Sequence, residues 1–295
     1  MAEQLSAEQL SAEAQWPRFD GVGLWLEAPH LGDRPDRILE RATTAAAAAE
    51  HLGLRTLWVS EWPSEPTSAS GVGTGGRPAG ALYEAYSLLG ALAVRTERVR
   101  LGVMGGSPMR REPSILAKIV TGVDVISHGR GVLTLDGDGR DLSGLDGLDE
   151  ALTVSRLVLE GTHPTFAGRI HSIDGAINRP LPVQLGGVPR VVVVRGDGPG
   201  RQGVLTIAVR SADALVVDGG ADGVREALAA ADEGGRGGVA GRGAVEVIGL
   251  CGPELHGVDV AGSVAEIRRS GATGCVIGLP YPWEPTVLEY RAATW

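Results

Sequence analysis

Short apolar segments alternate along this chain with segments of helical pattern, and this alternation constrains the fold more than any other feature. Segments such as residues 21–28 and 190–196 are apolar almost throughout, without a polar residue at every second position. Such strands are expected to be buried on both faces, as in a parallel sheet covered by helices. The expected strands are residues 21–28, 54–60, 99–105, 129–137, 190–196, 213–219, 244–252 and 274–280.

The segments between these strands have the spacing and end signals of helices. They are residues 36–52, 82–96, 112–127, 148–161, 204–212, 221–231 and 264–271. About eight strands in strict alternation with helices favour a closed (β/α)₈ barrel over an open sheet. An open dinucleotide-binding sheet would also carry GxGxxG after its first strand, whereas residues 27–30 are Glu-Ala-Pro-His. A small antiparallel excursion is expected over residues 165–174.

The length and charge of the chain agree with one soluble barrel. A single barrel takes roughly 250 residues, and the chain has 295 with a net charge of −9. Residues 1–18 repeat SAEQL as SAEAQ and are expected to form a disordered or frayed tail before a barrel over residues 19–295. The acidic charge argues against a nucleic-acid partner. No apolar segment approaches the ~20 residues of a membrane helix, and no secretory signal precedes the barrel, which indicates a cytoplasmic protein.

The cysteines and histidines indicate neither a disulfide nor a metal site. Cys251 and Cys275 lie in apolar surroundings, which favours two buried, reduced thiols over a disulfide. The six histidines are scattered, and no HxxxH or CxxC pair is present. We therefore expect no bound metal.

Candidate site residues follow the strands, because barrels of this class build their sites at the carboxyl ends of the strands. Glu27 and Glu61 are the candidates for proton transfer, with solvated rim carboxylates as the alternative. Trp62 is expected to stack on a substrate or to shield a bound ring. The other residues at strand ends are Ser60, Met104, Gly105, Gly106, Asp136, Gly137 and Asp138.

A second candidate is the loop Gly196-Asp197-Gly198-Pro199-Gly200-Arg201, which leads from a strand into a helix. Its glycines Gly196, Gly198 and Gly200 would let backbone N–H groups close on an anion at the helix N-terminus. Arg201 would add a bidentate donor. The alternative is an ordinary surface turn.

Several stretches in this order resemble the luciferase-like monooxygenases, a family that includes F420-dependent relatives. They are LGLRTLWVSEW (52–62), the long block 89–130 with its Leu-Ala-Lys and Asp-x-x-Ser-x-Gly-Arg elements, residues 166–184, and residues 191–216. The likeness spans roughly residues 20–280. It implies a (β/α)₈ barrel, trimmed here after the fourth strand and in the second half.

The resemblance also implies a cofactor and its contacts. We expect an F420-dependent oxidoreductase, with FMN as the alternative cofactor of a monooxygenase. The strand-end residues and the 196–201 loop would contact the cofactor, and a non-proline cis peptide bond is expected between residues 102 and 107. A phosphate of the cofactor would bind at the loop.

The chain also departs from the family pattern. Trp62 stands where the family often has a histidine, and the stretch after the fourth strand is short. A barrel that has lost catalysis and only binds a ligand or partner is therefore a second alternative. The resemblance further implies a homodimer formed through the helices of the first half, such as residues 42–50 and 85–93. The substrate is expected to be a small molecule or a peptide-derived compound.

Overall fold

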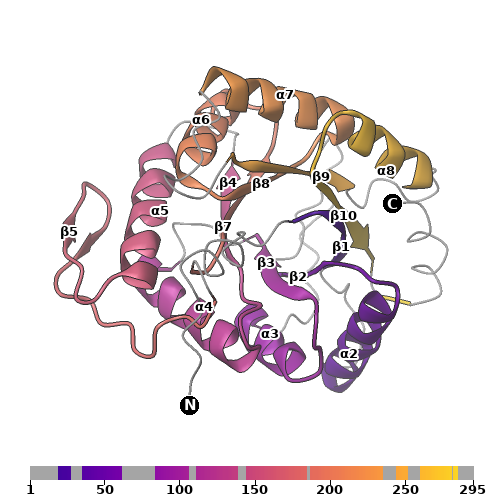
Figure 1. The fold of residues 1–295 in the computed structure, drawn as a ribbon, viewed down its shortest axis with the longest axis horizontal. Helices are drawn as coiled ribbons and strands as arrows, with labels where there is room; N and C mark the ends of the chain where they lie inside the picture. The colour runs from indigo at the N-terminus through magenta and orange to yellow at the C-terminus, as the bar shows by residue number, and fades with distance from the viewer. Residues whose placement is uncertain are drawn as a thin grey trace, which may run out of the picture.

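The chain forms a barrel of eight parallel strands (Figure 1). The computed structural model describes residues 19–27, 35–61, 84–105, 111–138, 144–184, 187–234, 244–251, 260–280 and 282–284. The barrel strands are β1 (Gly21–Leu26), β2 (Thr56–Ser60), β3 (Arg100–Met104), β4 (Leu133–Asp138), β7 (Arg190–Arg195), β8 (Ala214–Val217), β9 (Glu246–Cys251) and β10 (Gly274–Leu279). Residues 1–18, predicted to be a tail, lie outside the described residues.

The strands pair in the order β3-β2-β1-β10-β9-β8-β7-β4. The two ends of this sheet meet where Leu101 forms a parallel bridge with Gly131. The Leu101 N–H donates to the Arg130 carbonyl, and the Val132 N–H donates to the Leu101 carbonyl, both at 2.9 Å. These bonds bring β3 beside the start of β4, so the sheet curls into a nearly closed barrel.

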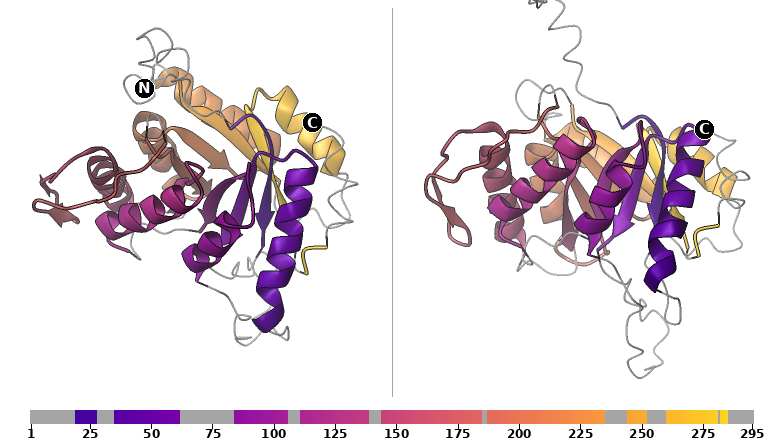
Figure 2. Two further views of the ribbon diagram at one scale, coloured as in Figure 1. Left: turned by 60° about the horizontal axis from the view of Figure 1, so that its bottom comes forward. Right: turned by 90° about the horizontal axis from the view of Figure 1, so that it is seen from below.

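Seven described helices surround the strands (Figures 1 and 2). They are α2 (Pro35–His51), α3 (Ala85–Ala93), α4 (Pro113–Ile126), α5 (Leu145–Glu160), α6 (Arg201–Ser211), α7 (Gly220–Glu233) and α8 (Val260–Arg269). The predicted (β/α)₈ barrel is therefore confirmed. Some predicted boundaries shift: α5 begins at Leu145 and α6 at Arg201, each three residues before the predicted start, and α8 begins at Val260, four residues before it.

The predicted antiparallel excursion is also confirmed. Strands β5 (Phe166–Ala167) and β6 (Ser172–Ile173) pair antiparallel and lie outside the ring of helices, beyond α5 (Figure 1). The Glu150 carboxylate of α5 accepts the backbone N–H groups of Arg169, Ile170 and His171 at 2.7–2.8 Å. One carboxylate thus attaches the turn of this hairpin to the barrel.

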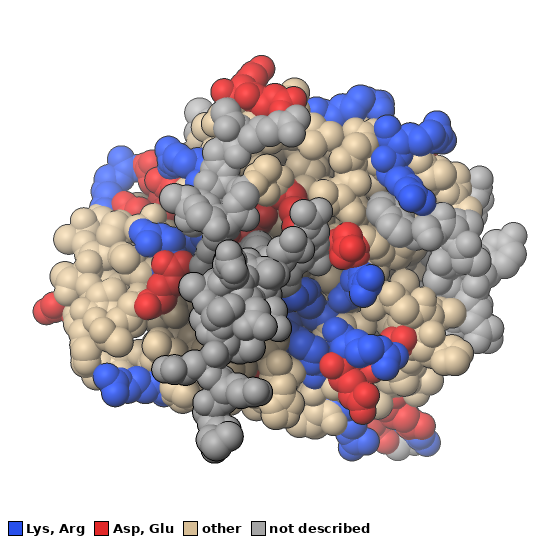
Figure 3. Space-filling view, in the orientation of Figure 1, with Lys and Arg blue, Asp and Glu red and all other residues tan. Residues whose placement is uncertain are grey.

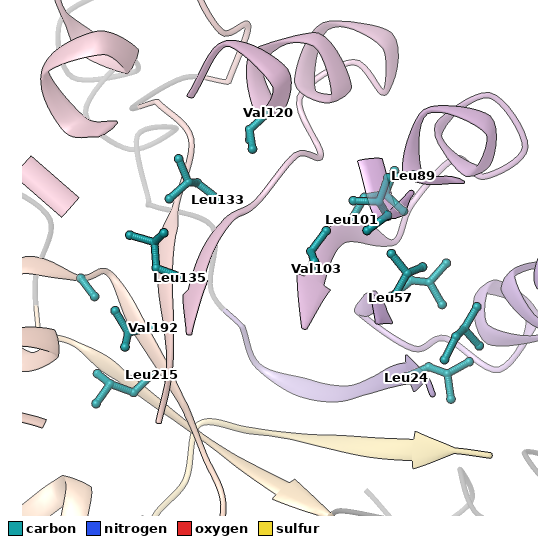
Figure 4. Close-up of a cluster of buried hydrophobic side chains, with 14 of the residues drawn as sticks. Leu24, Leu57, Leu89, Leu101, Val103, Val120, Leu133, Leu135, Val192 and Leu215 are labelled. Carbon is teal, nitrogen blue, oxygen red and sulfur yellow. The ribbon is translucent and has the colours of Figure 1, made fainter. Parts of the chain in front are cut away.

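Two layers of apolar side chains form the core. The larger layer lies between the strands and the helices and includes Leu24, Leu57 and Leu101 (Figure 4). The smaller layer consists of the residues that point into the barrel, such as Trp25 and Trp58. Because side chains alternate along a strand, neighbours such as Leu24 and Trp25 belong to different layers.

Trp58 fills the middle of the barrel and is fully buried. Its indole lies against Gly102 of β3, where an added Cβ would stand 2.4 Å from the ring. The indole Nε1–H donates to Thr56 Oγ1 at 2.8 Å, which satisfies the buried donor. On β1, Gly23 faces the Thr56 hydroxyl that accepts this hydrogen bond, and an added Cβ there would lie 1.9 Å from Thr56 Oγ1. Two glycines therefore make room for one tryptophan.

The amino end of the barrel is closed by paired charges. The Glu246 carboxylate accepts the Phe19 N–H at 2.8 Å, and the Arg100 guanidinium lies 5.9 Å from the centre of the Phe19 ring. Burial lowers the pKa of Arg100 to about 10, against the opposing effect of nearby carboxylates, of which Glu246 has the largest. This end of the barrel is a packed and neutralised structure.

The Asp-x-x-Ser-x-Gly-Arg element also lies at the amino end. Buried Asp124 accepts the backbone N–H groups of Val183 (2.8 Å) and Gln184 (3.3 Å). The Arg130 guanidinium donates to four oxygens of residues 93–99 and to the Ser127 carbonyl. These residues stabilise the connections between helices and strands. His128 lies exposed in the same turn.

The helix faces that were expected to form a dimer are used within the barrel. Ala42, Ala45, Ala46 and Ala49 of α2 are fully buried against the chain's own core, and so are Leu89 and Leu92 of α3 at 0–1% exposure. Large exposed apolar side chains lie on α2, directly after α3, on α4, and from the turn between β5 and β6 onward. They are Leu39, Val94, Ile115, Ile126, Ile170, Ile177, Leu181 and Val183.

The two cysteines are free and buried, as predicted. Their Sγ atoms lie 3.4 Å apart on the adjacent strands β9 and β10. The hydrogen bond with Cys251, together with burial, raises the pKa of Cys275 well above its ordinary value. The thiolate form is therefore disfavoured, and this pair is expected to be unreactive.

On the face seen in Figure 3, the basic and acidic side chains of the described residues are interspersed. Within the described residues, no helix is both long enough and apolar enough to cross a membrane.

The packing of Trp58 predicts opposite effects for two Gly→Ala substitutions. Gly102→Ala places a methyl group in the indole and is expected to lower the free energy of unfolding by about 1–3 kcal/mol. Gly90→Ala on α3 meets nothing within 4 Å and is expected to be neutral or to stabilise by about 0.5–1 kcal/mol. Urea unfolding of both variants measures the difference. Equal effects would contradict the account of the barrel interior.

Glu50 predicts a pH-dependent contribution to stability. Its carboxylate accepts the N–H groups of Glu97, Arg98 and Val99 at 2.5–3.0 Å. Burial acts to raise the pKa of Glu50, but these bonds outweigh it and hold the pKa below 4.5. The ionised carboxylate therefore stabilises the fold above pH 4.5, and this contribution is lost as the pH falls through the folded-state pKa.

Glu50→Gln is accordingly expected to lower the free energy of unfolding more at pH 7 than at pH 3. Denaturant unfolding at the two pH values measures this. Glu40→Gln on the same helix is the control, since Glu40 is 63% exposed and pairs only with its neighbour Arg37. A Glu50→Gln penalty that does not change with pH would refute the prediction.

Candidate active site at the carboxyl end of the barrel

Polar side chains gather where the inward-facing rows of the strands reach the carboxyl end of the barrel. Trp25, Met104 and Val193 belong to the layer inside the barrel. Because side chains alternate, the next inward positions are Glu27 after Trp25 and Arg195 after Val193. The parallel strands bring all these ends to one mouth, where barrels of this class bind their ligands.

A tryptophan and an arginine from opposite sides of the barrel meet across its interior. The Arg195 guanidinium lies 5.5 Å from the centre of the Trp25 ring. Their strands, β7 and β1, stand four places apart in a ring of eight, so this contact spans the barrel. A cation over an indole face is attracted to the ring quadrupole. This pair, which we call the Trp25–Arg195 floor, separates the apolar interior from the mouth.

Two further residues hold the floor in place. The Trp25 Nε1–H donates to Ser60 Oγ at 2.9 Å, and this hydroxyl donates to the Leu26 carbonyl at 3.2 Å. On the other side, Arg195 Nε lies 3.3 Å from Asp136 Oδ2. The predicted residues Ser60 and Asp136 are thus brought together with the floor, through one hydrogen bond and one ion pair.

Glu27 is held at the edge of the mouth by its backbone and by a glycine. Its N–H donates to the Leu279 carbonyl at 3.1 Å, and its carbonyl accepts the Trp283 Nε1–H at 2.9 Å. Its carboxylate lies over Gly278, where an added Cβ would stand 2.2 Å from Oε1. Glu27 is only 7% exposed. It is therefore a fixed and buried carboxylate rather than a solvated rim residue.

Glu61 lies in a buried cluster of charges beside β2 and β3. Its side chain is 6% exposed and forms an ion pair with Arg111, and its Oε2 makes no hydrogen bond within the described residues. Arg111 also pairs with Glu84 at 2.9 Å and lies 5.3 Å from the centre of the Tyr86 ring. Burial raises the pKa of Tyr86, so its phenol stays protonated.

The 196–201 loop leads from β7 into α6 as predicted, but its arginine is already engaged. Arg201 donates to Glu226 at 2.7 Å, to Asp218 at 2.6 Å and to the Gly196 carbonyl at 2.9 Å. Asp218 also accepts the Gly196 N–H at 2.9 Å. Arg201 therefore shapes the loop from within. The donors that this loop offers to an anion are the backbone N–H groups at the start of α6.

Gly137, also predicted to contact a cofactor, instead faces outward from β4. An added Cβ there would lie 2.3 Å from Val204 of α6. It is small because the helix packs closely on the strand. Gly105 follows Met104 with φ of +100°, a conformation that favours glycine.

Two predicted residues and one predicted side chain fall outside the described part of the chain. Trp62 and Gly106 lie outside the described residues, and so does the side chain of Asp138. Within the described residues, the recorded cis bond is Arg179–Pro180, so the bonds joining residues 102 to 105 are trans. The cis bond expected between residues 102 and 107 is therefore absent from the described part of that stretch.

Sequence reasoning missed several residues of this mouth. Trp25, Arg195, Arg111 and Tyr86 were not predicted, and neither was Trp283. Two of them follow from the period of two along a strand, since Trp25 precedes Glu27 by two residues and Arg195 follows Val193 by two. Arg111, Tyr86 and Trp283 lie outside the strands, and no local pattern marks them.

Known proteins resemble this chain in sequence and in fold. The family model described as luciferase-like monooxygenase matches residues 22–248. Among solved structures, the chain is similar to the coenzyme F420-dependent tetrahydromethanopterin reductase from Methanopyrus kandleri, with a TM-score of 0.65 and 16% identity over 94% of this chain and 98% of the other.

Two monooxygenases are also similar to the chain. RslO1 from Streptomyces bottropensis has a TM-score of 0.67 and 16% identity over 93% of this chain and 98% of the other. The oxygenating constituent of 3,6-diketocamphane monooxygenase from Pseudomonas putida, solved with FMN, has a TM-score of 0.58 and 14% identity over 78% and 66%. At these identities the likenesses show the shared fold.

The charge cluster predicts unequal losses when its partners are removed. Arg111→Gln leaves the Glu61 carboxylate buried without its cation and is expected to lower the free energy of unfolding by about 3 kcal/mol. Glu84→Gln removes a partner that is 48% exposed and is expected to change it by less than about 1 kcal/mol. Thermal and denaturant unfolding measure both.

A double variant provides the control for this prediction. Glu61→Gln together with Arg111→Gln removes both buried charges and is expected to recover part of the stability lost in Arg111→Gln alone. Losses that simply add in the double variant would show that the two residues are not coupled.

Proposed function

Because the chain belongs to the luciferase-like monooxygenase family, a family of oxidoreductases, we propose that it is an F420-dependent oxidoreductase acting on a small organic substrate. The observation that carries the proposal is the mouth itself: an aromatic and cationic floor with buried carboxylates after the neighbouring strands β1 and β2. Such a site accommodates a planar ring and provides groups for proton transfer.

The described residues fit a flavin-type cofactor. The Trp25–Arg195 floor offers a flat base for a ring, and the turn after Met104, with Gly105 at positive φ, allows close approach of the backbone. The start of α6 would hold a phosphate through backbone N–H groups. When bound, the cofactor supplies the hydride chemistry, and the protein orients it.

The two carboxylates would divide the remaining work. Glu61 has a buried oxygen without a hydrogen-bond partner among the described residues, which suits it to accept or hold a proton at Oε2. Glu27, after the neighbouring strand β1, is held by contacts with Trp283 and Gly278. The floor keeps water out of the barrel interior, which strengthens electrostatic interactions at the site.

The charge of the phosphate loop favours F420 over FMN. Arg201 is neutralised by Asp218 and Glu226, so the described part of the loop offers a helix N-terminus worth roughly half a charge. A singly charged phosphodiester, as in F420, suits such a site better than the nearly doubly charged terminal phosphate of FMN. An FMN-dependent monooxygenase is the alternative that the same mouth could serve.

Titration of the purified full chain with F420 and with FMN, each oxidised and reduced, tests this proposal. We expect F420 to bind at least about tenfold more tightly than FMN, a difference of about 1.4 kcal/mol. Tighter binding of FMN would overturn the choice of cofactor. A chain that binds neither would support a barrel that only binds another ligand or partner.

A substitution in the loop tests the phosphate site separately. Gly198→Asp adds a negative charge before α6 and is expected to weaken cofactor binding about tenfold or more. Gly122→Asp adds the same charge on α4, at an exposed position with nothing within 4 Å, and is expected to leave the affinity unchanged. Fluorescence titration measures both. Equal affinity in the two variants would place the phosphate elsewhere.

A further inference from the structure

Arg195 offers hydrogen-bond donors at the centre of the mouth that the proposed function does not yet use. Its side chain is 31% exposed, and within the described residues its two terminal nitrogens make no hydrogen bond. The ion pair with Asp136 involves Nε, and the contact with Trp25 involves the face of the guanidinium. The outer edge of the guanidinium therefore remains available to a ligand.

Two other arginines, one on β7 and one at the start of α6, differ from Arg195. Arg190, at the amino end of the same strand, is 2% exposed and pairs with buried Asp213. Arg201 is surrounded by Asp218, Glu226 and the Gly196 carbonyl. Both are neutralised within the protein and have structural roles. Arg195 has one ion pair and one ring contact, and its outer edge stays open.

We propose that Arg195 recognises negative charge delocalised over a planar ring that lies on the Trp25–Arg195 floor. A guanidinium presents parallel N–H donors in a rigid fork, which matches an anion whose charge is shared between ring and exocyclic atoms. The apolar interior beneath it, with Trp25 3% exposed and Met104 1% exposed, weakens screening of this charge.

Asp136 sets the preference for a charged ring over a neutral one. Its carboxylate fixes the orientation of Arg195 and offsets part of the positive charge. A neutral ring gains a hydrogen bond from the guanidinium, whereas an anionic ring also gains the attraction between opposite charges, which is stronger in a poorly screened site. The site should discriminate between two charge states of one ligand.

Two sources could supply such an anion. One is the cofactor ring after reduction, when it carries a delocalised negative charge. The other is an aromatic substrate ionised as a phenolate. The first source rests on the proposed function, because it requires a flavin or deazaflavin in the mouth, and the second can be tested without any cofactor.

The test compares the wild-type chain with Arg195→Gln, Arg195→Lys and the control Arg210→Gln. Arg210 lies on α6, is 61% exposed and pairs with Asp149. Dissociation constants are measured without oxygen for oxidised and reduced F420 and FMN. We expect Arg195→Gln to weaken binding of the reduced form about tenfold or more, and of the oxidised form less than about threefold. Arg210→Gln should match the wild type.

A second arm uses 4-nitrophenolate, whose absorbance reports binding, with and without the oxidised cofactor. One outcome is that Arg195→Gln binds nitrophenolate more weakly, while the ratio of its dissociation constants for oxidised and reduced cofactor stays as in the wild type. This result assigns the recognition to the substrate. The proposal is overturned if Arg195→Gln changes neither the cofactor affinities nor the nitrophenolate affinity. It is also overturned if the affinity for oxidised and reduced cofactor falls equally and the nitrophenolate affinity does not change. Wild-type protein that binds neither cofactor overturns the proposed function, while the nitrophenolate arm still decides the role of Arg195.

Arg195→Lys keeps the test valid if Arg195→Gln does not fold, as judged by thermal unfolding. Lysine retains the charge but not the fork. We expect it to bind the reduced form or nitrophenolate about threefold or more weakly than the wild type, with a smaller effect on the oxidised form. Wild-type affinities in Arg195→Lys would mean that charge alone suffices and would overturn the role of the fork.

Discussion

Eight parallel strands can close into a barrel only if the side chains that point inward fill the space they enclose. Here large aromatic side chains provide the filling, and glycines on neighbouring strands provide the room. Trp58 occupies the middle of the barrel against Gly102 and near Gly23, and Trp25, its register partner on β1, also points into the barrel. The other features of the molecule depend on this packing, because interiors of native density leave little space for adjustment.

The same filling also produces the floor of the candidate active site. A tryptophan inside the barrel, such as Trp25, needs a partner for its N–H and a contact for its ring. Ser60 provides the first and Arg195, from the opposite side of the barrel, provides the second. A packing requirement of the core therefore places a cation at the centre of the mouth, where it can act on a bound ligand.

Charged groups at the amino end of the barrel have partners within the protein, whereas some at the carboxyl end do not. The first set contributes to stability, and the second is available for function. At the amino end, Arg190 is paired with Asp213, and Asp124 is surrounded by backbone donors. These groups are satisfied by the protein and tolerate burial. At the carboxyl end, Arg195 keeps an open edge, and Glu61 keeps a buried oxygen without a partner among the described residues. A bound ligand can supply the hydrogen-bond partners that these groups lack.

The sequence by itself determined the barrel, the order of its elements and the carboxylates at the strand ends. Hydrophobic pattern and strand order are local properties, and parallel strands bring their carboxyl ends together whatever the details. Only the tertiary structure decided which charges remain open. Arg201 looked like an anion donor because its loop is rich in glycine, yet Asp218 and Glu226, which follow it by 17 and 25 residues, neutralise it. Arg195 became the exposed cation because its strand lies opposite Trp25. These two residues are 170 positions apart in the sequence, so no local pattern predicts their contact.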